Sequence, residues 1–349
     1  MSASSTPLVR WGMLSTSGIG RVAATALADV PGAEFAAIAG RDADRAAAYA
    51  AELGIPRSYG SYDELLADPD IDAVYVPLPI ALHAEWTVKT IQAGKHVLCE
   101  KPFAPTVAEV ESCFDAAEAA DRLCIEGLMW RHHPQTLLAQ RLIADGAIGR
   151  LAFIRAALTV DVPAGDVRRT GALGGGAVLD LGCYCLSAIR LFGGEPVRIS
   201  AAQVLDPAEG ADSGDLRLAA TLTLADDVLA QFDVALDYPR RDELELIGTG
   251  SKITIPDPWL CRRGYLELER DGVTERLVVD PTGAAGLTEP GDDNLDAYRI
   301  ELATATALIA SGGTPTFGRE DAMAQAGAIE AVREAARTGV PVALERSAR

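Results

Sequence analysis

The first third of the chain alternates short apolar runs with amphipathic stretches. Runs that suit β-strands lie at 9–14, 35–39, 73–77, 96–100 and 123–128. Stretches that suit helices lie between them, at 19–30, 42–53, 62–67, 81–93 and 106–120. A regular alternation of strand and helix is typical of a parallel sheet joined by right-handed crossovers. We therefore expect an α/β domain over residues 1–128.

The pattern changes after residue 128. Two helix-like stretches enclose one strand-like run, a long region of successive strand-like runs follows, and two helix-like stretches close the chain. In this order the segments lie at 134–145, 151–160, 177–192, 197–279, 295–310 and 320–338. They predict a second, α+β domain over 129–349 with a mostly antiparallel, open sheet. Its last helix is a candidate to pack back on the first domain.

The 349-residue chain has an ordinary globular composition with an excess of acidic residues. Hydrophobic residues make up 49% of it and charged residues 23%, and the formal net charge is −19. Because binding to nucleic-acid phosphates needs a basic patch, we expect no nucleic-acid partner. The polar start, Met1–Pro7, lacks the apolar region of a signal peptide, and no apolar run reaches membrane-spanning length. We therefore expect a cytoplasmic protein with no membrane partner.

The six cysteines lie mostly inside apolar runs. Without a secretion signal, this placement predicts buried free thiols. Cys183 and Cys185 lack a second cysteine or histidine pair to complete a zinc site, so we expect no metal.

The segment 9–23, VRWGMLSTSGIGRVA, leads from a strand into a helix through a turn of small residues. Such a turn lets backbone amides and the helix N-terminus approach a pyrophosphate, so it favours dinucleotide binding. In the preferred register, Ser15, Ser17 and Gly20 take the three glycine positions; a register on Gly18, Gly20 and Ala23 starts the turn too late. The residues expected to contact the cofactor here are Ser15, Thr16, Ser17, Gly18 and Ile19.

The end of the second predicted strand reads Ala39-Gly40-Arg41-Asp42. NAD-binding domains place an acid here to hold the ribose diol, whereas a guanidinium pairs with the 2′-phosphate of NADP. We therefore expect Gly40 and Arg41 to contact the cofactor, with Arg45 helping one helical turn on, and NADP(H) to be preferred over NAD(H). The alternative is that Arg41 is a solvated surface charge and that Asp42 only caps the next helix.

A third motif, AGKHVLCEKP at 93–102, completes a pattern that resembles the Gfo/Idh/MocA oxidoreductase family. Within it, the chain looks most like the branch of dimeric dihydrodiol dehydrogenases, xylose dehydrogenases and sugar-ketone reductases. Supporting segments are YGSYDELL at 59–66, WRHHP at 130–134 and LGGGAVLDLGCY at 173–184. The resemblance implies a Rossmann domain followed by an α/β domain whose open sheet often forms dimers. We expect a homodimer or a dimer of dimers.

Hydride transfer to a ketone leaves negative charge on oxygen, so the site needs a proton donor and a nearby cation. Lys101 follows a parallel strand at the end where open α/β sheets bind ligands. The resemblance assigns the matching lysine this role and implies a cis bond before Pro102. Asp180 and Tyr184 lie four residues apart on one helix face. Where many members have histidine, this chain has Tyr184, which makes Tyr184 the candidate general acid. Asp180 is expected to orient substrate hydroxyls or Lys101. The alternative for Tyr184 is a core aromatic residue.

The resemblance extends to further residues of the site. Trp130 and Arg131 match a pair that lines the cofactor cleft, and Glu100 and Leu78 are expected to contact the cofactor. His83 is expected near the nicotinamide, with a structural histidine at a helix start as the alternative. Arg168 is a candidate to face the substrate, and the segments 161–170 and 238–241 are expected to supply pocket residues.

These features predict an NADP(H)-dependent oxidoreductase for a sugar, cyclic polyol or trans-dihydrodiol. The alternative from another class is a non-catalytic NADP(H)-binding sensor or regulatory protein, against which Lys101, Asp180 and Tyr184 argue. A related enzyme with a non-sugar substrate, such as a linear tetrapyrrole or an imine, is a third reading. The sequence does not name the substrate or the physiological direction.

Overall fold

The computed structural model describes residues 7–207, 210 and 213–344. The chain forms two compact units, one of 1–129 with 295–323 and one of 130–294 with 324–349. The division lies one residue from the expected boundary, but the penultimate helix belongs to the first unit rather than the second.

The first unit contains a six-stranded parallel sheet with the order β3-β2-β1-β4-β5-β6. Its strands are β1 (Val9–Leu14), β2 (Ala33–Ala39), β3 (Arg57–Tyr59), β4 (Ala73–Val76), β5 (His96–Glu100) and β6 (Cys124–Gly127). This is the strand order of a Rossmann domain, which confirms the predicted fold class. The order reverses between β1 and β4, so the ligand crevice of such a sheet lies beyond the carboxyl ends of these two strands.

The helices of the first unit are α1 (Gly18–Leu27), α2 (Ala43–Leu53), α3 (Tyr62–Leu66), α4 (His83–Gln92), α5 (Val107–Ala120) and α8 (Asp296–Ser311), with the short η1 (Ile80–Leu82) before α4. Four of them begin where the sequence supplies a side-chain cap. Ser17, Asp42, Ser61 and Thr106 cap α1, α2, α3 and α5 by accepting a backbone N–H three residues on.

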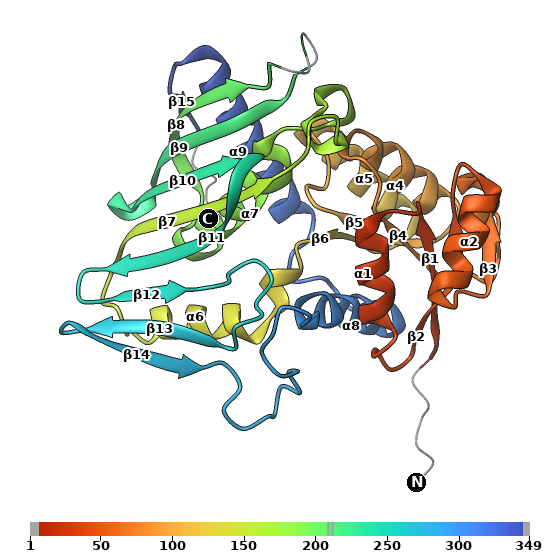
Figure 1. The fold of residues 1–349 in the computed structure, drawn as a ribbon, viewed down its shortest axis with the longest axis horizontal. Helices are drawn as coiled ribbons and strands as arrows, with labels where there is room; N and C mark the ends of the chain where they lie inside the picture. The colour runs from red at the N-terminus through yellow and green to blue at the C-terminus, as the bar shows by residue number, and fades with distance from the viewer. Residues whose placement is uncertain (1–6, 208–209, 211–212, 345–349) are drawn as a thin grey trace. The chain divides into compact units, whose positions relative to one another are not determined.

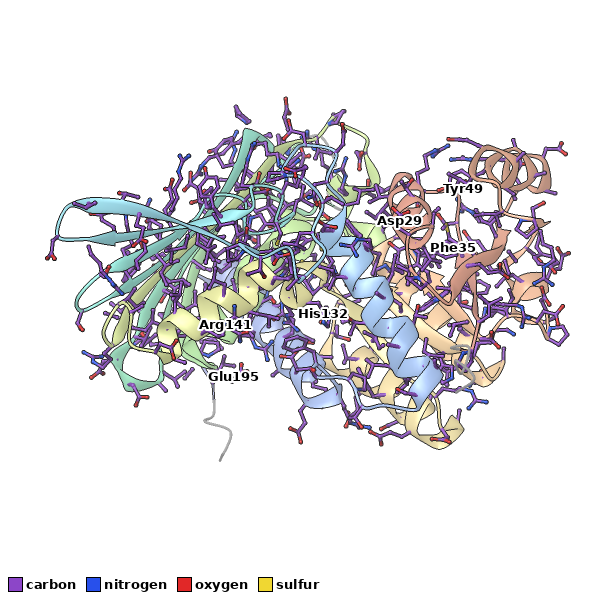
Figure 2. The ribbon with its side chains drawn as sticks, turned by 90° about the horizontal axis from the view of Figure 1, so that it is seen from below. Asp29, Phe35, Tyr49, His132, Arg141 and Glu195 are labelled. Atoms are coloured by element: carbon purple, nitrogen blue, oxygen red, sulfur yellow. The ribbon has the colours of Figure 1, made fainter. Side chains whose placement is uncertain are left out.

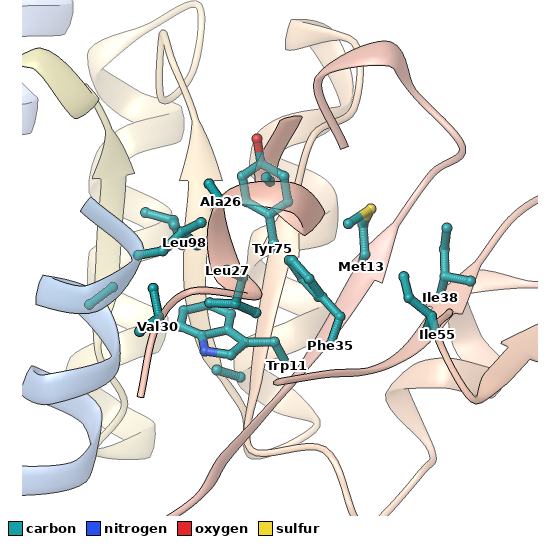
Figure 3. Close-up of a cluster of buried hydrophobic side chains, with 14 of the residues drawn as sticks. Trp11, Met13, Ala26, Leu27, Val30, Phe35, Ile38, Ile55, Tyr75 and Leu98 are labelled. Atoms are coloured by element: carbon teal, nitrogen blue, oxygen red, sulfur yellow. The ribbon is translucent and has the colours of Figure 1, made fainter. Parts of the chain in front are cut away.

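The core of the first unit explains why α8 belongs to it. Trp11 of β1 is fully buried, and its indole N–H donates to Thr306 Oγ1 of α8 at 3.2 Å. Figure 3 shows Trp11 and Phe35 with Tyr75 in this cluster, and Leu302 and Ala305 of α8 belong to it as well. In Figure 1, α8 runs beside α1. A helix from the far end of the chain therefore seals the face of the sheet beside α1.

The second unit contains a nine-stranded sheet with the order β14-β13-β12-β11-β7-β10-β9-β8-β15 (Figure 1). Its strands are β7 (Leu151–Asp161), β8 (Pro196–Leu205), β9 (Asp215–Leu224), β10 (Leu229–Ala235), β11 (Asp237–Gly248), β12 (Lys252–Ile255), β13 (Tyr265–Arg270), β14 (Val273–Val278) and β15 (Val342–Ala343). Neighbouring strands are antiparallel except for β7 and β10. The mostly antiparallel sheet confirms the second half of the predicted fold class.

Helices cover one face of this sheet. They are α6 (Pro134–Ala144), α7 (Cys183–Gly193) and most of α9 (Arg319–Thr338), with short turns η2 (Met129–His132), η3 (Val167–Arg169), η4 (Gly171–Leu173), η5 (Val178–Gly182) and η7 (Ala225–Asp227). Figure 2 labels His132 just before α6 and Arg141 near its end. The run Gly171–Gly193 is long and apolar enough to cross a membrane, but 83% of its most apolar window is buried within the fold, as in a core helix.

All six cysteines are buried thiols rather than disulfides, as the sequence predicts. Among the described residues, no group of three or more His, Cys, Asp or Glu side chains could hold a metal ion.

The contact between α1 and the sheet requires a glycine at position 20. A Cβ built on Gly20 would lie 2.7 Å from Met13 Sδ and 2.7 Å from the Tyr49 hydroxyl. That hydroxyl cannot move freely, since it donates to the Ser17 carbonyl at 2.7 Å. A Cβ on Gly18 would meet nothing within 4 Å. Only the register on Ser15, Ser17 and Gly20 makes Gly20 the third position of the motif, which is the glycine that allows helix and strand to pack closely.

We predict that Gly20→Ala destabilises the protein by about 1–2 kcal/mol, because the methyl group overpacks this contact. Gly18→Ala is the control: it adds the same methyl group in open space and improves helix propensity. Urea unfolding of both variants measures the difference. Equal unfolding free energies for the two variants would contradict the assigned register.

Candidate cofactor and substrate sites

The turn after β1 has the features of a phosphate-binding loop. Ser15 has φ 103°, in the region that favours glycine, at the position of the motif's first glycine. Its N–H donates to the Ala39 carbonyl, which ties the turn to the end of β2. Ser17 Oγ accepts from the Gly20 N–H at 3.3 Å, and α1 begins at Gly18. Thr16 and Ile19 lie in the same turn and are half-buried.

These features fit a dinucleotide. The turn leads into the N-terminus of α1 at the carboxyl end of β1, beside the point where the strand order reverses. Helix N-termini attract anions because their first N–H groups lack partners within the helix. We infer that the pyrophosphate of a nicotinamide dinucleotide fits at Ser15–Ile19, with Leu78 beyond the end of β4 on the same edge of the sheet.

The end of β2 carries exposed guanidinium groups. Arg41 and Arg45 are both exposed, and neither forms an ion pair with a described residue. Asp42 accepts a hydrogen bond from the Arg45 N–H and caps α2. The alternative interpretation, in which Asp42 caps the next helix, is therefore correct for this residue. Gly40 is buried, and its N–H donates to the Tyr59 carbonyl. Arg41 is therefore available to an anion at this edge of the sheet.

Lys101 follows β5 directly, and the Lys101–Pro102 bond is cis, as the family resemblance implies. Two carboxylates hold the backbone on either side of this bond. Glu100 Oε2 accepts from the Lys101 N–H at 3.2 Å, and Glu126 Oε1 accepts from the Phe103 N–H at 3.0 Å. The Tyr75 hydroxyl donates to the other oxygen of Glu100. The half-buried lysine thus stands on a turn whose backbone is bonded to side chains of the sheet.

His83 supports the same turn from α4. Its ring nitrogens lie 2.9 Å from the Pro102 carbonyl oxygen and 2.8 Å from the Leu78 carbonyl oxygen. Only the charged imidazole ring could donate to both carbonyls. Burial lowers the pKa of His83 and so disfavours that charged form. These contacts fit the structural alternative for His83, and a contact with the nicotinamide stays a prediction.

Glu301 of α8 is a feature of this region that the sequence did not reveal. It is fully buried, and its Oε1 has no hydrogen-bond partner. Burial, and then the charges of Glu100 and Glu126, raise the pKa of Glu301 well above its ordinary value. The three carboxyl groups therefore lie in one buried region, which disfavours the charged form of Glu301.

In the second unit, Asp180 and Tyr184 lie where a π-turn passes into α7. Val178–Gly182 form the π-turn, and π-turns inside helices often occur at functional sites. Asp180 is half-buried and Tyr184 is buried with its ring 5.8 Å from that of Trp259. The segment is thus not the regular α-helix expected from the sequence.

Asp215, at the start of β9, holds this π-turn in place. Its Oδ2 accepts from the Val178 N–H at 2.8 Å, and its Oδ1 occupies the space that a Cβ on Gly176 would need. Gly176 has φ 134°, a second reason for glycine. Burial raises the pKa of Asp215 to about 6, against the stabilising effect of the backbone N–H groups. The sequence shows Asp215 only as one acidic residue among many.

Arg168 and Arg240 lie within electrostatic reach of the Asp180–Tyr184 pair. Hydrogen bonds to Asp166 and then the charge of Asp180 raise the pKa of Arg168. Burial lowers the pKa of Arg240, but its ion pair with Asp242 and the charges of Asp257 and Tyr184 outweigh that effect. The sequence expectation for Arg168 is consistent with this position, and contact with substrate stays a prediction.

Trp130 and Arg131 are buried by contacts inside the second unit. The Trp130 ring packs edge-to-face on Trp259, 5.9 Å between centroids, and tilts against Phe192. Arg131 Nε donates to Ser187 Oγ of α7 at 2.6 Å. These contacts give both residues a structural role, and their predicted contact with the cofactor stays a prediction.

Comparisons with known proteins agree with both halves of the fold. Residues 9–128 match the model described as "Oxidoreductase family, NAD-binding Rossmann fold", and residues 136–254 match the "GFO/IDH/MocA C-terminal domain". The chain is 36% identical to D-xylose 1-dehydrogenase (NADP(+)) 2 of Haloferax volcanii, covering 96% of this chain and 99% of that one. It is 33% identical to trans-1,2-dihydrobenzene-1,2-diol dehydrogenase of Danio rerio, covering 78% of this chain and 81% of the other.

A solved structure extends the similarity to three dimensions. KijD10, a 3-ketoreductase from Actinomadura kijaniata in complex with NADP and TDP-benzene, superposes with a TM-score of 0.85 at 30% identity, covering 94% of this chain and 98% of that one. Fold, turn and relatives together define an oxidoreductase with an NAD(P)-binding Rossmann domain. The chain belongs to the Gfo/Idh/MocA oxidoreductase family, as its motifs indicate.

We predict that Asp215→Asn changes the pH dependence of stability. Because burial raises the folded-state pKa of Asp215 from its ordinary value of 3.8 to about 6, the stability linked to this group is complete below pH 3.8 and is lost as the pH rises through about 6. Wild type should therefore lose about 3 kcal/mol relative to Asp215→Asn across that window. Urea unfolding of both proteins at a series of pH values measures this difference in unfolding free energy.

The control is Asp226→Asn, which removes an exposed carboxyl group of the same unit. Its unfolding free energy should follow wild type across the same pH range. A constant difference between wild type and Asp215→Asn would contradict the raised pKa and the buried position of Asp215.

Proposed function

We propose that this chain is an NADP(H)-dependent oxidoreductase acting on a secondary alcohol or ketone of a sugar, cyclic polyol or trans-dihydrodiol. The observation that carries the proposal is a half-buried lysine fixed at the carboxyl end of β5, in a sheet whose β1 end has a phosphate-binding turn. The named activities of the relatives support the substrate class, since they include a xylose dehydrogenase and a dihydrodiol dehydrogenase.

The chemistry divides between the cofactor and three side chains. The bound nicotinamide would supply or accept the hydride. In the reductive direction, Lys101 donates a hydrogen bond to the substrate oxygen and stabilises the negative charge that develops on it. The Tyr184 hydroxyl gives its proton to that oxygen, and in the oxidative direction the phenolate takes the proton back. Asp180 accepts hydrogen bonds from substrate hydroxyls and so orients the reacting carbon.

The preference for NADP(H) rests on the end of β2. Arg41 is exposed and forms no ion pair with a described residue, so pairing with a 2′-phosphate costs no existing ion pair. Arg45 lies one helical turn further along. The NADP(+) in the name of the xylose dehydrogenase and the NADP in the KijD10 complex support the same cofactor.

We also propose a cytoplasmic homodimer or dimer of dimers, with the open face of the nine-stranded sheet as the interface. Arg155, Thr221, Gln231 and Asp233 line a hollow of about 470 Å³ over β7–β10. Small side chains, chiefly Ala201, Ala202 and Ala219, complete its lining, so a second sheet can approach closely.

We predict that Arg41→Ala lowers the ratio of kcat/KM with NADP(H) to kcat/KM with NAD(H) by about tenfold or more, because a hydrogen-bonded charge pair is worth about 1.5–3 kcal/mol. Arg10→Ala is the control, since Arg10 is an exposed arginine at the start of β1, away from the carboxyl ends of the strands. Steady-state kinetics with both cofactors measures the ratio. An unchanged ratio in Arg41→Ala rules out the assignment.

We predict that Lys101→Met and Tyr184→Phe each lower kcat by about 100-fold or more while cofactor binding persists, since each removes a group that acts on the reacting oxygen. Tyr265→Phe removes a hydroxyl from β13 and should leave kcat unchanged. Stopped-flow turnover against xylose, ketosugars and trans-diols, with cofactor titration by fluorescence, separates binding from chemistry.

Two outcomes would contradict the proposal. Tyr184→Phe with most of its turnover would remove the tyrosine from the mechanism. Wild type that binds NADP(H) tightly but turns over none of these substrates would favour a non-catalytic sensor instead.

A further inference from the structure

The arginines nearest Asp180 and Tyr184 are all matched by carboxylates. Arg168 donates through Nε and Nη2 to both oxygens of Asp166, each at 2.9 Å. Arg240 donates in the same two-pronged way to Asp242, at 2.6 and 2.8 Å. These pairs join residues only two positions apart, so each segment neutralises its own charge.

The other arginines of the two segments expected to line the pocket, 161–170 and 238–241, are paired with carboxylates as well. Arg169 pairs with Asp206. Arg241 pairs with Asp233 and with Glu243. Every arginine of the two segments therefore already has an acidic partner.

A third guanidinium, that of Arg262, is paired with a carboxylate that acts electrostatically on Arg240. Its Nε donates to Asp257 Oδ2 at 2.8 Å. Asp257 is buried and acts electrostatically on Arg240, which in turn feels the charge of Tyr184. The three guanidiniums of Arg168, Arg240 and Arg262 thus interact with four carboxylates of the same unit, those of Asp166, Asp180, Asp242 and Asp257.

We propose that the substrate bound by Asp180 and Tyr184 is uncharged: a free sugar, polyol or diol rather than one linked to a phosphate or nucleotide. The inference rests on the proposed function and narrows its substrate class. A phosphate is held best by the planar edge of a guanidinium, and here a carboxylate occupies that edge in both Arg168 and Arg240.

These carboxylates favour neutral ligands in two ways. A phosphate group brought among them would meet like charge. Hydroxyl groups, in contrast, donate hydrogen bonds to carboxylates, whose oxygens accept more bonds than one guanidinium uses. The proposed substrate thus differs from the ligand of KijD10, which was crystallised with TDP-benzene, despite the shared fold.

The test compares free and phosphorylated sugars in the wild-type enzyme. With NADP+, kcat/KM is measured for D-xylose, D-glucose, glucose 6-phosphate and dTDP-glucose at equal ionic strength, and trans-dihydrodiols are included as a second neutral class. We expect neutral substrates to exceed phosphorylated ones by about 100-fold, because like-charge juxtaposition costs several kcal/mol. Turnover confined to phosphorylated sugars would overturn the inference while leaving the oxidoreductase intact. No turnover of any member would instead contradict the proposed function.

Charge variants provide an independent measurement. Asp166→Asn and Asp242→Asn release Arg168 and Arg240 without changing side-chain volume. Each should strengthen competitive inhibition by dTDP by about tenfold, since the released guanidinium can pair with the diphosphate. Glu334→Gln is the matched control, because it breaks a similar pair with Arg337 on the surface of α9. Equal inhibition of all three variants would mean that these carboxylates do not select against anions.

Discussion

Buried carboxylates that accept backbone N–H groups hold the turns on which the proposed chemistry depends. Glu100 and Glu126 bond the backbone on either side of the Lys101–Pro102 bond, and Asp215 bonds the start of the π-turn that carries Asp180. Each acceptor comes from a strand, whose position is fixed by its ladder. A loop tied in this way keeps its side chains in one place without rigid packing of the side chains themselves.

Burying carboxyl groups in this way disfavours their charged forms, and the size of this effect differs from one group to another. A carboxylate that accepts N–H groups keeps its charge more readily, whereas a buried carboxylate without donors is neutral. Glu301 shows the second case, and Asp215 lies between the two with a pKa of about 6. The hydroxyl of Tyr75, whose pKa burial and Glu100 raise, remains a donor and supports the charge on Glu100. Burial thus favours the neutral forms of Glu301 and Tyr75 beside the carboxyl groups that hold the lysine turn.

The sequence predicts those elements and residues whose pattern lies within one short segment of the chain. β1 and β5 are apolar runs between turn residues, and their predicted bounds agree with the structure to the residue. Lys101 was found because it follows such a run. The three-residue β3 is too short and polar to stand out, and α8 was assigned to the wrong unit because its partner, Trp11, lies 295 residues away from Thr306. Asp215 and Glu301 were missed for the same reason, since a carboxylate becomes distinctive only when the fold buries it beside a particular turn.

The distinction between contacts within one segment and contacts between distant segments also separates the residues proposed to support the chemistry from those proposed to select the substrate. The supports of Lys101 and Asp180 join distant parts of the sequence, so changing one of them disturbs a strand or a helix start. The pairs Arg168–Asp166 and Arg240–Asp242 join residues two positions apart on partly exposed segments. A substitution in either pair can change the net charge at that place without displacing the sheet. On this proposal, one scaffold keeps its proton and hydride chemistry while a substitution in either of two such pairs alters its charge selectivity. A family that contains a xylose dehydrogenase, a diol dehydrogenase and a ketoreductase crystallised with a diphosphate compound is what such a separation allows.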